Sequence, residues 1–259
     1  MDFIIQSFII QLSECFFFGS LKNLCTTKFA GYIFISSFLF LGINQFSDLT
    51  KEEFAAQYKG LKFPAIPKQY LCPVIKKDAD IPDAHVPNSW DWRTQNVLTP
   101  IKNQGGCGSC WAFTTVESAH AHKHKELVSL SEQQVVDCDD TCSGCGGGLM
   151  SEAFNIIYFT LSYRYLVKTC TSNFFLAIQA EALLSYHKGI ISVAGCDEGP
   201  LDHAVNLVGY GSENGTDYWI VRNSWGKNFG EKGYFRMERG KGKNTCSFLN
   251  DAMAAVEVE

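Results

Sequence analysis

Apolar residues crowd the beginning of the chain, and after residue 41 the sequence becomes a mixture of polar and apolar positions. Residues 1–41 are rich in Phe, Ile, Leu and Ser and carry almost no charge. Asp2 stands where a signal peptide has a positive charge, and Gln6 and Gln11 interrupt the first apolar run. The second run, Phe29 to Leu41, is shorter than the roughly 20 residues that a membrane helix needs. We therefore interpret residues 1–41 as an atypical hydrophobic segment, either a signal or anchor or a misassembled start, with no stable membrane span.

The pattern that follows predicts one short helix and then a connector. Thr50 followed by Glu53 is a capping-box pattern, which predicts a helix that begins directly after Thr50. Five of the seven prolines then fall within residues 61–87. A proline-rich stretch of this kind indicates an extended, exposed connector that proteases cut readily.

Three later segments have regular patterns. The amphipathic run from Trp111 to about Lys125 predicts a helix. The runs from Asp202 to Gly211 and from Asp217 to Arg222 predict two strands, each of which ends in a turn.

Composition limits the class of protein. The 259 residues can hold one enzyme domain of about 200 residues and an appendage. With 46% hydrophobic and 14% aromatic residues, wholesale disorder is excluded. The net charge of −5 and the pI near 5.7 argue against nucleic acid as a partner and suit an acidic compartment. Eleven cysteines suggest an oxidising compartment, and their odd number leaves at least one thiol unpaired.

The densest chemical signal is the run from Gln104 to Phe113, which contains two cysteines in a glycine-rich turn directly before the predicted helix. Cys110 therefore lies at or next to a helix N-terminus, where the helix dipole and free N–H groups favour a thiolate and lower the cysteine pKa. A thiolate is the attacking species in thiol catalysis. A disulfide, a redox pair and half of a zinc site remain alternatives for Cys107 and Cys110, although no second C-x-x-C completes a zinc site at the usual spacing.

His203 and Asn223 supply the groups that a catalytic thiolate needs. An imidazole can hold the proton of the thiol and pass it to the leaving amine. An amide oxygen, such as that of Asn223, can fix the imidazole in one tautomer. Cys110, His203 and Asn223, each in a distinctive local context, therefore indicate nucleophilic catalysis.

These residues resemble the papain-like cysteine peptidases, and most closely the cathepsin L and F group. Cys107 to Trp111 matches the family pattern C-G-[SA]-C-[WY], and the resemblance covers residues 42–259 with gaps. It implies an α+β, papain-like two-domain fold. In that fold a helical half carries Cys110, a β-barrel half carries His203 and Asn223, and the substrate lies in the cleft between them.

The resemblance also implies the organisation of the chain. The spaced residues Gly42, Asn44, Phe46 and Asp48 are similar to a motif of the family's inhibitory propeptides. Residues 42–85 would then be a remnant of the propeptide and a linker, and residues 86–259 the peptidase domain.

Roles carry over onto matching positions. Cys110 would be the nucleophile, His203 the general acid and base, and Asn223 the group that orients the imidazole, shielded by Trp225. Gln104 would donate its amide to the oxyanion together with the backbone N–H of Cys110. The substrate-binding residues implied by the resemblance are Gly147, Gly148, Met150, Leu201, Asp202, Ala204, Trp225 and Asp251. Gly147 and Gly148 would bind an extended peptide through their backbones. Asp251 would lie near the floor of the specificity pocket and admit Arg or Lys there.

The same resemblance implies three disulfide bridges, and the sequence also contains one glycosylation sequon. The three bridges it implies are Cys107–Cys145, Cys138–Cys170 and Cys196–Cys246, with Cys142 as an extra cysteine that could compete with Cys145. Asn214 begins a glycosylation sequon between two predicted strands, which is consistent with secretion.

The chain departs from the family pattern in its length. His203 and Asn223 follow Cys110 by 93 and 113 residues, whereas the family has about 130 to 150. The loss of about 40 residues is concentrated between Phe154 and Ala177 and would remove the first barrel strand and a helix. We therefore expect an incomplete barrel, which exposes a strand edge.

The predicted function is that of a cysteine-type endopeptidase made as a zymogen, acting at acid pH in lysosomal-type protein breakdown. The expected location is the lysosome or the secreted space. Its partners would be polypeptide substrates, its own propeptide and cystatin-like inhibitors; we expect a monomer that uses no cofactor and binds no metal or nucleic acid. One alternative is a catalytically impaired homologue that binds peptides or propeptides. The other is a metal-binding protein that uses the histidines and cysteines of two neighbouring runs: His120, His122, His124, Cys138, Cys142 and Cys145.

Overall fold

The computed structural model describes the larger part of the chain from residue 32 onward. The described ranges are 32–36, 39–62, 87–118, 129–160, 174–192, 196, 199–240, 245–250 and 252–254. The fold set out below is that of residues 33–259, which form one compact unit.

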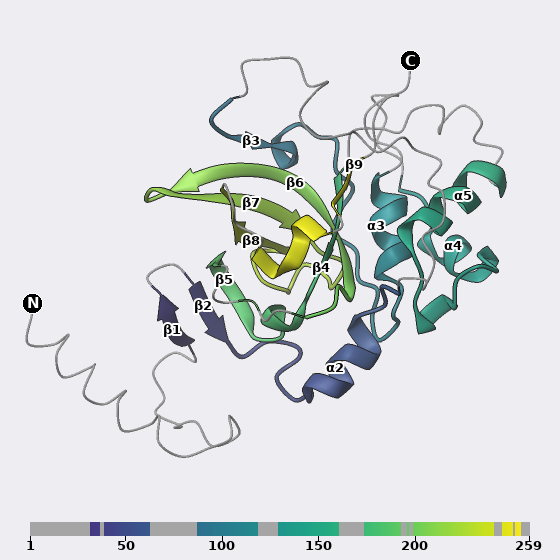
Figure 1. Cartoon of the computed structure of the whole chain (residues 1–259), viewed down its shortest axis with the longest axis horizontal. Coiled ribbons are helices and arrows are strands. Elements are labelled where there is room, and N and C mark those ends of the chain that lie inside the picture. The colour runs from purple at the N-terminus through teal and green to yellow at the C-terminus, as the bar shows by residue number, and fades with distance from the viewer. Residues whose placement is uncertain are drawn as a thin grey trace, which may run out of the picture. The chain divides into compact units, whose positions relative to one another are not determined.

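Helices and strands alternate unevenly along the chain (Figure 1). The α-helices are α2 (Lys51–Tyr58), α3 (Cys110–Ser118), α4 (Glu132–Cys138) and α5 (Met150–Thr160). The short 3-10 helices are η2 (Trp92–Thr94), η3 (Gly144–Gly146), η4 (Glu181–Leu183) and η6 (Thr245–Asn250). The strands are β1 (Tyr32–Ser36), β2 (Leu39–Gly42), β3 (Trp90–Asp91), β4 (Phe174–Ile178), β5 (Tyr186–Ile191), β6 (His203–Glu213), β7 (Thr216–Arg222), β8 (Tyr234–Glu238) and β9 (Ala252–Ala254).

Helix α2 begins where the capping box predicts. The Thr50 side chain accepts a hydrogen bond from the Glu53 N–H at 3.2 Å, and the Glu53 carboxylate accepts one from the Thr50 N–H at 2.8 Å. Two N–H groups that a helix start leaves unpaired are thereby satisfied. The predicted helix after Cys110 is also present as α3, although residues 119–128 lie outside the described part of the chain.

The strands form one nine-stranded sheet in the order β1-β2-β5-β8-β7-β6-β4-β9, with β3 paired to β6. The two predicted strands are β6 and β7, which pair antiparallel around an exposed turn at Asn214 and Gly215. Both turn residues have positive φ, 51° and 81°, which suits a tight hairpin turn. Among the described residues the sheet does not close on itself, in agreement with the expected incomplete barrel.

Two hydrophobic cores lie on the two sides of the fold. Helices α3, α4 and α5 gather at one side of the sheet, and we call residues 110–160 the helical half (Figure 1). Its core contains Trp111, Val116, Val135, Met150 and Ile157. We call residues 174–254 the sheet half.

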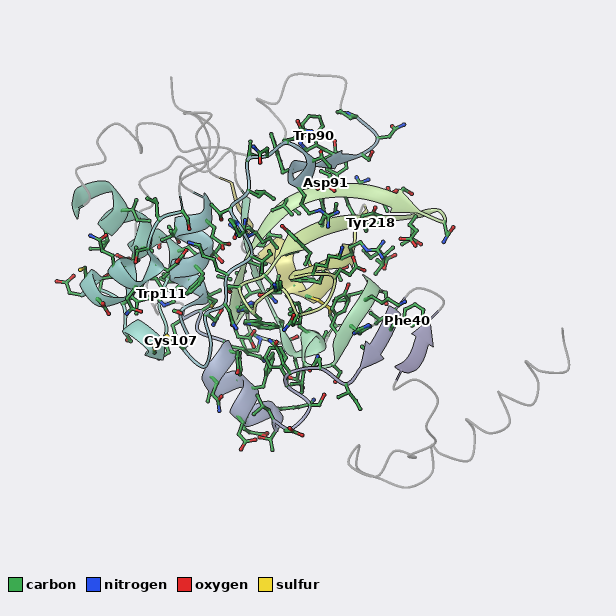
Figure 2. All side chains as sticks on the ribbon, turned by 180° about the vertical axis from the view of Figure 1, so that it is seen from behind. Phe40, Trp90, Asp91, Cys107, Trp111 and Tyr218 are labelled. Atoms are coloured by element: carbon green, nitrogen blue, oxygen red, sulfur yellow. A yellow bond between two sulfur atoms is a disulfide. The ribbon has the colours of Figure 1, made fainter. Side chains whose placement is uncertain are left out.

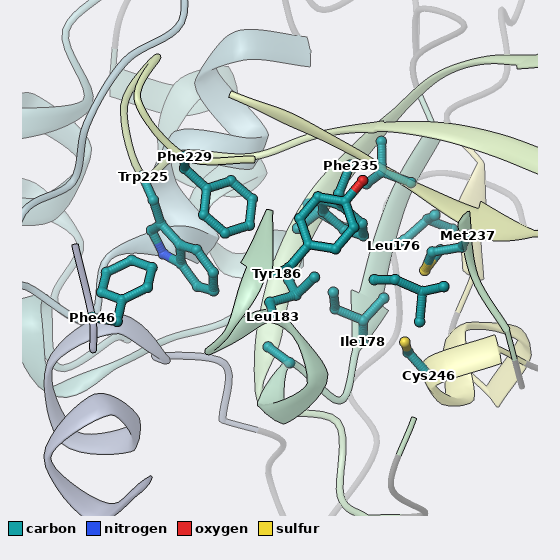
Figure 3. Packing of buried hydrophobic residues seen from close by; sticks show 14 of the residues in the cluster. Phe46, Leu176, Ile178, Leu183, Tyr186, Trp225, Phe229, Phe235, Met237 and Cys246 are labelled. Atoms are coloured by element: carbon teal, nitrogen blue, oxygen red, sulfur yellow. The ribbon is translucent and has the colours of Figure 1, made fainter. Parts of the chain in front are cut away.

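The core of the sheet half extends into residues that precede it by more than a hundred positions. It is built from β4 to β8 and η4, and it includes Ile178, Val205, Trp225 and Phe235. Leu39, Phe46 and Phe54 belong to the same core. Figure 3 shows Phe46 beside Trp225 and Phe229 at one end of this core. We call residues 39–62 the N-terminal segment; it starts with β2, inside the hydrophobic region interpreted above as 1–41.

Two of the three expected disulfides are present, Cys107–Cys145 and Cys196–Cys246. The first joins the loop before α3 to η3 in the helical half, and the second joins the chain before β6 to η6. The expected bridge from Cys138 is not formed: its thiol is free and exposed, and Cys170 lies outside the described residues.

Candidate active site

A tight loop brings Cys110 to the first position of α3. The Gly108 N–H donates to the Cys145 carbonyl oxygen at 3.0 Å, and the Cys107–Cys145 disulfide ties the same loop to η3. A Cβ atom on Gly108 would lie 2.6 Å from the Cys145 carbonyl oxygen, so only glycine allows this close approach. Figure 2 shows Cys107 and Trp111, which flank Cys110, among the helical elements. The predicted placement of Cys110 at a helix N-terminus is confirmed.

The predicted low pKa of Cys110 is wrong for this state of the molecule. The thiol is completely buried, and burial raises its pKa to about 11. The backbone N–H groups of Ala204, Gly60 and Trp111 oppose this rise but do not outweigh it. Desolvation therefore exceeds the effect of the helix terminus, and the thiol is neutral.

His203 and Asn223 meet because β6 and β7 are neighbouring strands. His203 is the first residue of β6, Asn223 follows β7, and His203 Nε2 lies 2.9 Å from Asn223 Oδ1. The Trp225 ring stacks on the imidazole with its centroid at 4.5 Å. His203 is completely buried, and burial lowers its pKa to about 4, although the hydrogen bond to Asn223 opposes this. The imidazole is therefore also neutral here.

Gln104 is held in one orientation beside these residues. Its Oε1 accepts a hydrogen bond from the Ser224 hydroxyl at 2.6 Å, and its Nε2 donates to the Cys107 carbonyl at 2.8 Å. Nε2 also reaches the carbonyl oxygen of Tyr58 at 3.3 Å. Ser224 thus directs the NH₂ end of the amide toward the N-terminal segment. Ser224 is not among the site residues predicted from the sequence, although its place directly after Asn223 is a usable signal.

The N-terminal segment runs across the residues predicted to bind substrate. The N–H groups of Gly60 and Leu61 both donate to the Asp202 carbonyl at 3.1 Å. The Lys62 N–H donates to the Gly148 carbonyl at 3.1 Å, and the Gly148 N–H donates to the Gly60 carbonyl at 2.8 Å. Leu61 and Gly148 therefore form a parallel β-bridge. Asp202 and Gly148 offer their backbones to an extended peptide, and the peptide bound there is part of the same chain.

Glycine is required where this segment passes the loop before α3. A Cβ atom on Gly60 would lie 1.8 Å from the Gly108 carbonyl oxygen, which is backbone and cannot rotate away. Next to it, the Lys59 ammonium forms an ion pair with the Asp202 carboxylate at 2.8 Å. The positive charge of Lys59 further lowers the pKa of His203. Neither Gly60 nor Lys59 is among the site residues predicted from the sequence.

Aromatic side chains anchor the segment on Trp225. The rings of Phe46 and Phe54 lie 5.1 and 5.2 Å from the Trp225 ring, both edge to face, and Tyr58 lies 6.4 Å away. Such ring pairs contribute about 0.5–1.5 kcal/mol each beyond the burial of area. The Gln45 side chain adds a hydrogen bond from its amide to the Trp225 carbonyl at 2.9 Å.

Three of the predicted pocket residues lie together. Met150 and Ala204 are buried in one hydrophobic cluster, Leu201 packs against it, and Leu61 of the N-terminal segment belongs to the same cluster. Gly147 differs from Gly148, because its carbonyl accepts a hydrogen bond from Ser143 of its own loop at 2.8 Å. Asp251 lies outside the described residues.

The metal-binding alternative loses part of its ligand set. Cys145 is consumed by a disulfide, and His120, His122 and His124 lie outside the described ranges. The half-buried Cys142 is a free thiol whose sulfur accepts a hydrogen bond from the Leu149 N–H at 3.4 Å. In the part of the chain that the structure describes, no three His, Cys, Asp or Glu side chains converge as metal ligands would.

No helix among the described residues is long and apolar enough to cross a membrane.

Comparisons with known proteins find similar sequences and structures. The sequence profile "Papain family cysteine protease" matches in two pieces, residues 86–172 and 163–256, which overlap at residues 163–172 inside the shortened region. The viral cathepsin of Lymantria dispar multicapsid nuclear polyhedrosis virus is 36% identical over 252 residues, covering 81% of this chain and 69% of that protein.

Two solved structures of precursor forms are similar to the fold. Digestive procathepsin L2 from the larval midgut of Tenebrio molitor has a TM-score of 0.70 and 30% identity, covering 86% of this chain and 84% of that one. The Amb a 11 cysteine protease of ragweed pollen in its proform has a TM-score of 0.67 and 32% identity, with coverages of 85% and 78%.

Proposed function

Because the chain belongs to the papain family of cysteine proteases, we propose that it is an endopeptidase in a zymogen form, with Cys110, His203 and Asn223 as its catalytic set. The observations that carry the proposal are the 2.9 Å contact between His203 Nε2 and Asn223 Oδ1 and the buried Cys110 thiol at the start of α3, which the backbone N–H of Ala204, the residue after His203, contacts. The N-terminal segment is the inhibitory propeptide in this proposal. It occupies the backbone positions of Asp202 and Gly148 that a substrate would use.

The reaction is acyl transfer through the Cys110 sulfur. The thiolate attacks the carbonyl carbon of the peptide bond while His203 carries the thiol proton as imidazolium. The backbone N–H of Cys110 and the amide of Gln104 donate to the oxyanion that forms. His203 then gives its proton to the departing amine, and a thioester remains on Cys110. A water molecule, deprotonated by His203, attacks this thioester and releases the acid product and the thiol.

Release of the propeptide would allow Cys110 and His203 to form a thiolate–imidazolium ion pair. In the closed state burial raises the pKa of Cys110 to about 11 and lowers that of His203 to about 4, so both groups are neutral. Withdrawal of residues 58–62 admits water, which reduces the desolvation and favours thiolate and imidazolium together. Cleavage in the connector before Pro87, followed by dissociation at acid pH, is the activation route that we propose.

The pocket for the second residue before the cut would be lined by Met150, Leu201 and Ala204, which now share a cluster with Leu61. Leucine-like side chains suit this apolar lining. Asp251 near its floor would also admit Arg or Lys. Replacing Asp251 by Ala should then reduce cleavage after x-Arg-x more than after x-Leu-x, measured with matched peptide substrates. Equal loss on both peptides would remove Asp251 from the pocket.

A route through the secretory pathway to lysosomes or to the outside is consistent with the two disulfides. Asn214, exposed at the tip of the β6–β7 hairpin, is the proposed glycosylation site. We propose a monomer that cleaves polypeptides without a cofactor and that cystatin-like inhibitors can block.

Covalent labelling tests the function directly. The full chain is activated at acid pH, treated with an epoxysuccinyl thiol-peptidase inhibitor and digested for peptide mass spectrometry. We expect stoichiometric label on Cys110, and none in the His203→Ala variant. Absence of label on a soluble, disulfide-complete protein would instead favour a catalytically impaired homologue that binds peptides, an alternative that the unclosed sheet keeps open.

A further inference from the structure

A buried ion pair joins the two halves behind the candidate site. Arg222 is the last residue of β7 and directly precedes Asn223, while Glu117 lies in α3, the helix that begins with Cys110. Arg222 Nη2 donates to Glu117 Oε1 at 2.7 Å, and the two side chains are only 1% and 3% exposed. Neither residue is part of the catalytic set proposed above.

The same guanidinium also holds a third part of the chain. Nη2 of Arg222 lies 2.9 Å from Thr99 Oγ1 and 3.0 Å from the Pro100 carbonyl oxygen. These two residues precede the loop that leads to Gln104. The Arg222 side chain thus links the end of β7 to helix α3 and to the chain segment that leads to Gln104, the candidate oxyanion donor.

A second side chain at the same rung of the hairpin contacts the same helix. Asn206 is the cross-strand partner of Arg222 in the β6–β7 pair. Its Nδ2 donates to the Thr114 carbonyl oxygen of α3 at 3.0 Å and is buried. Both strands that supply the candidate base and its orienting amide are therefore fastened to the helix that supplies the thiol.

Stability alone is a weak reason for such a pair. Taking two charges out of water costs several kcal/mol per ion, and well-packed apolar residues of similar volume are often as stable or more so. What a charged pair adds is direction, because a short, charge-assisted hydrogen bond is made in only one relative placement of its partners.

We propose that the Arg222–Glu117 ion pair is a positioning device that sets the distance between Cys110 and the His203–Asn223 pair. This inference rests on the proposed function for its kinetic consequence but not for its structural one. Misplacement of a reacting group by about 1 Å can cost about 100-fold in rate. A small rotation of β7 against α3 would therefore change the distance between Cys110 and His203 and lower the rate.

Several groups surround the pair and enter any test by pH. Lys102 and Glu132, which form an ion pair with each other, act on the pKa of Glu117, and both Arg222 and Glu117 act on the pKa of Tyr234. Burial raises the pKa of Glu117 to about 7 although Arg222 opposes it. Below that pH the carboxyl group is protonated, and its Oε1 still accepts the hydrogen bond from the Arg222 guanidinium. Replacing Glu117 by Gln keeps a hydrogen-bond acceptor of the same shape but removes the charge and the titration.

The experiment compares three variants of the full chain. Arg222→Met removes the pair, and Arg222→Lys retains a charge at that position. Arg236→Met is the control, because Arg236 on β8 forms partly exposed ion pairs with Glu231, at 3.0 Å, and with Glu213, and neither pair involves α3. The first readout, proton NMR of the His203 Nε2–H signal in the uncut protein, needs no activity. The second is kcat per Cys110 titrated with the epoxysuccinyl inhibitor, together with KM and the pH profile of thiol alkylation after activation.

We expect Arg222→Met to shift or broaden the His203 signal and to lower kcat per titrated site roughly 10- to 100-fold, with KM nearly unchanged. Its alkylation profile should also move, while Arg222→Lys recovers most of the loss and Arg236→Met changes neither readout. Should Arg222→Met fail to fold, Glu117→Gln takes its place. An unchanged His203 signal and an unchanged kcat per site in the folded variant would overturn the proposal. A wild-type protein that takes no label but loses its His203 signal in Arg222→Met would overturn the peptidase function and leave the positioning role standing.

Discussion

The two halves that meet at Cys110 bury their apolar residues in different ways. The core of the helical half comes mainly from α3, α4 and α5, which follow one another within residues 110–160, and takes only Leu61 from the N-terminal segment. The core of the sheet half takes Leu39, Phe46 and Phe54 from that segment, all nearly or fully buried. The proposed propeptide therefore supplies several core residues to the sheet half, whereas it supplies only Leu61 to the core of the helical half.

This difference couples release of the N-terminal segment to the stability of one half. Burial of a Phe side chain contributes about 1.5–3 kcal/mol, so losing Phe46 and Phe54 leaves the sheet half with exposed aromatic surface around Trp225. The helical half loses a contact at Leu61 and keeps its disulfide-tied loop. We expect perturbations of the N-terminal segment to weaken the sheet half first.

The largest effect should come from Phe46→Ala. Deleting a buried Phe costs about 3–5 kcal/mol, and here it also removes the ring that contacts Trp225 and Phe229. We expect lower unfolding free energy in urea and faster labelling of Cys110 in the uncut chain. Ile157→Ala, a matched deletion in α5, should destabilise the protein without exposing Cys110. Similar labelling rates in both variants would contradict the comparison.

The pH dependence of stability should divide between the two halves with opposite signs. Buried His203 has a pKa of about 4, against about 6.5 in an unfolded chain, so it destabilises the closed form as pH falls through this window. Glu117 has a pKa of about 7, against about 4.3 unfolded, so it stabilises the folded form as pH falls through an overlapping window. Each effect is on the order of 3 kcal/mol at most.

Two variants separate these contributions. On acidification from pH 7 to 4.5, the urea unfolding midpoint should rise in His203→Asn relative to that of the wild type, and it should fall in Glu117→Gln relative to that of the wild type. If both variants kept the wild-type slope, neither group would titrate in a state-dependent way.

A smaller effect is expected from Gly60→Ala. The new Cβ would collide with the Gly108 carbonyl, and overpacking of this kind costs about 1–3 kcal/mol. The segment should lift from Cys110, and labelling of the uncut chain should become faster. Gly106→Ala is the control, because its Cβ would meet only the Gln57 side chain at 3.5 Å. Labelling no faster than in Gly106→Ala would show that residue 60 does not seal the thiol.

The smallest effect concerns the two helix caps. Thr50→Ala removes the capping box of α2 and should cost about 1 kcal/mol, whereas Ser131 at the start of α4 makes no side-chain capping bond. Ser131→Ala should therefore be close to neutral in the same thermal unfolding measurement. Equal shifts in melting temperature would mean that the α2 cap does not stabilise the docked segment.

Local chemistry made several elements predictable. The capping box places the start of α2, the glycine-rich cysteine motif places Cys110 at the start of α3, and the β6–β7 hairpin follows from two predicted strands separated by a turn at Asn214 and Gly215. Each of these features depends on residues a few positions apart, which the chain order alone brings together.

The family, the candidate catalytic residues and the secondary structure around them could be predicted from the amino-acid order, because these depend on residue type and short spacing. The fold was needed to find the neutral state of Cys110 and His203, the covering of Asp202 and Gly148 by residues 60–62, and the contact of Arg222 with Glu117. Those properties depend on desolvation and on contacts between segments that are distant along the chain. A helix terminus favours a thiolate in water, and the same thiol beneath a bound segment keeps its proton.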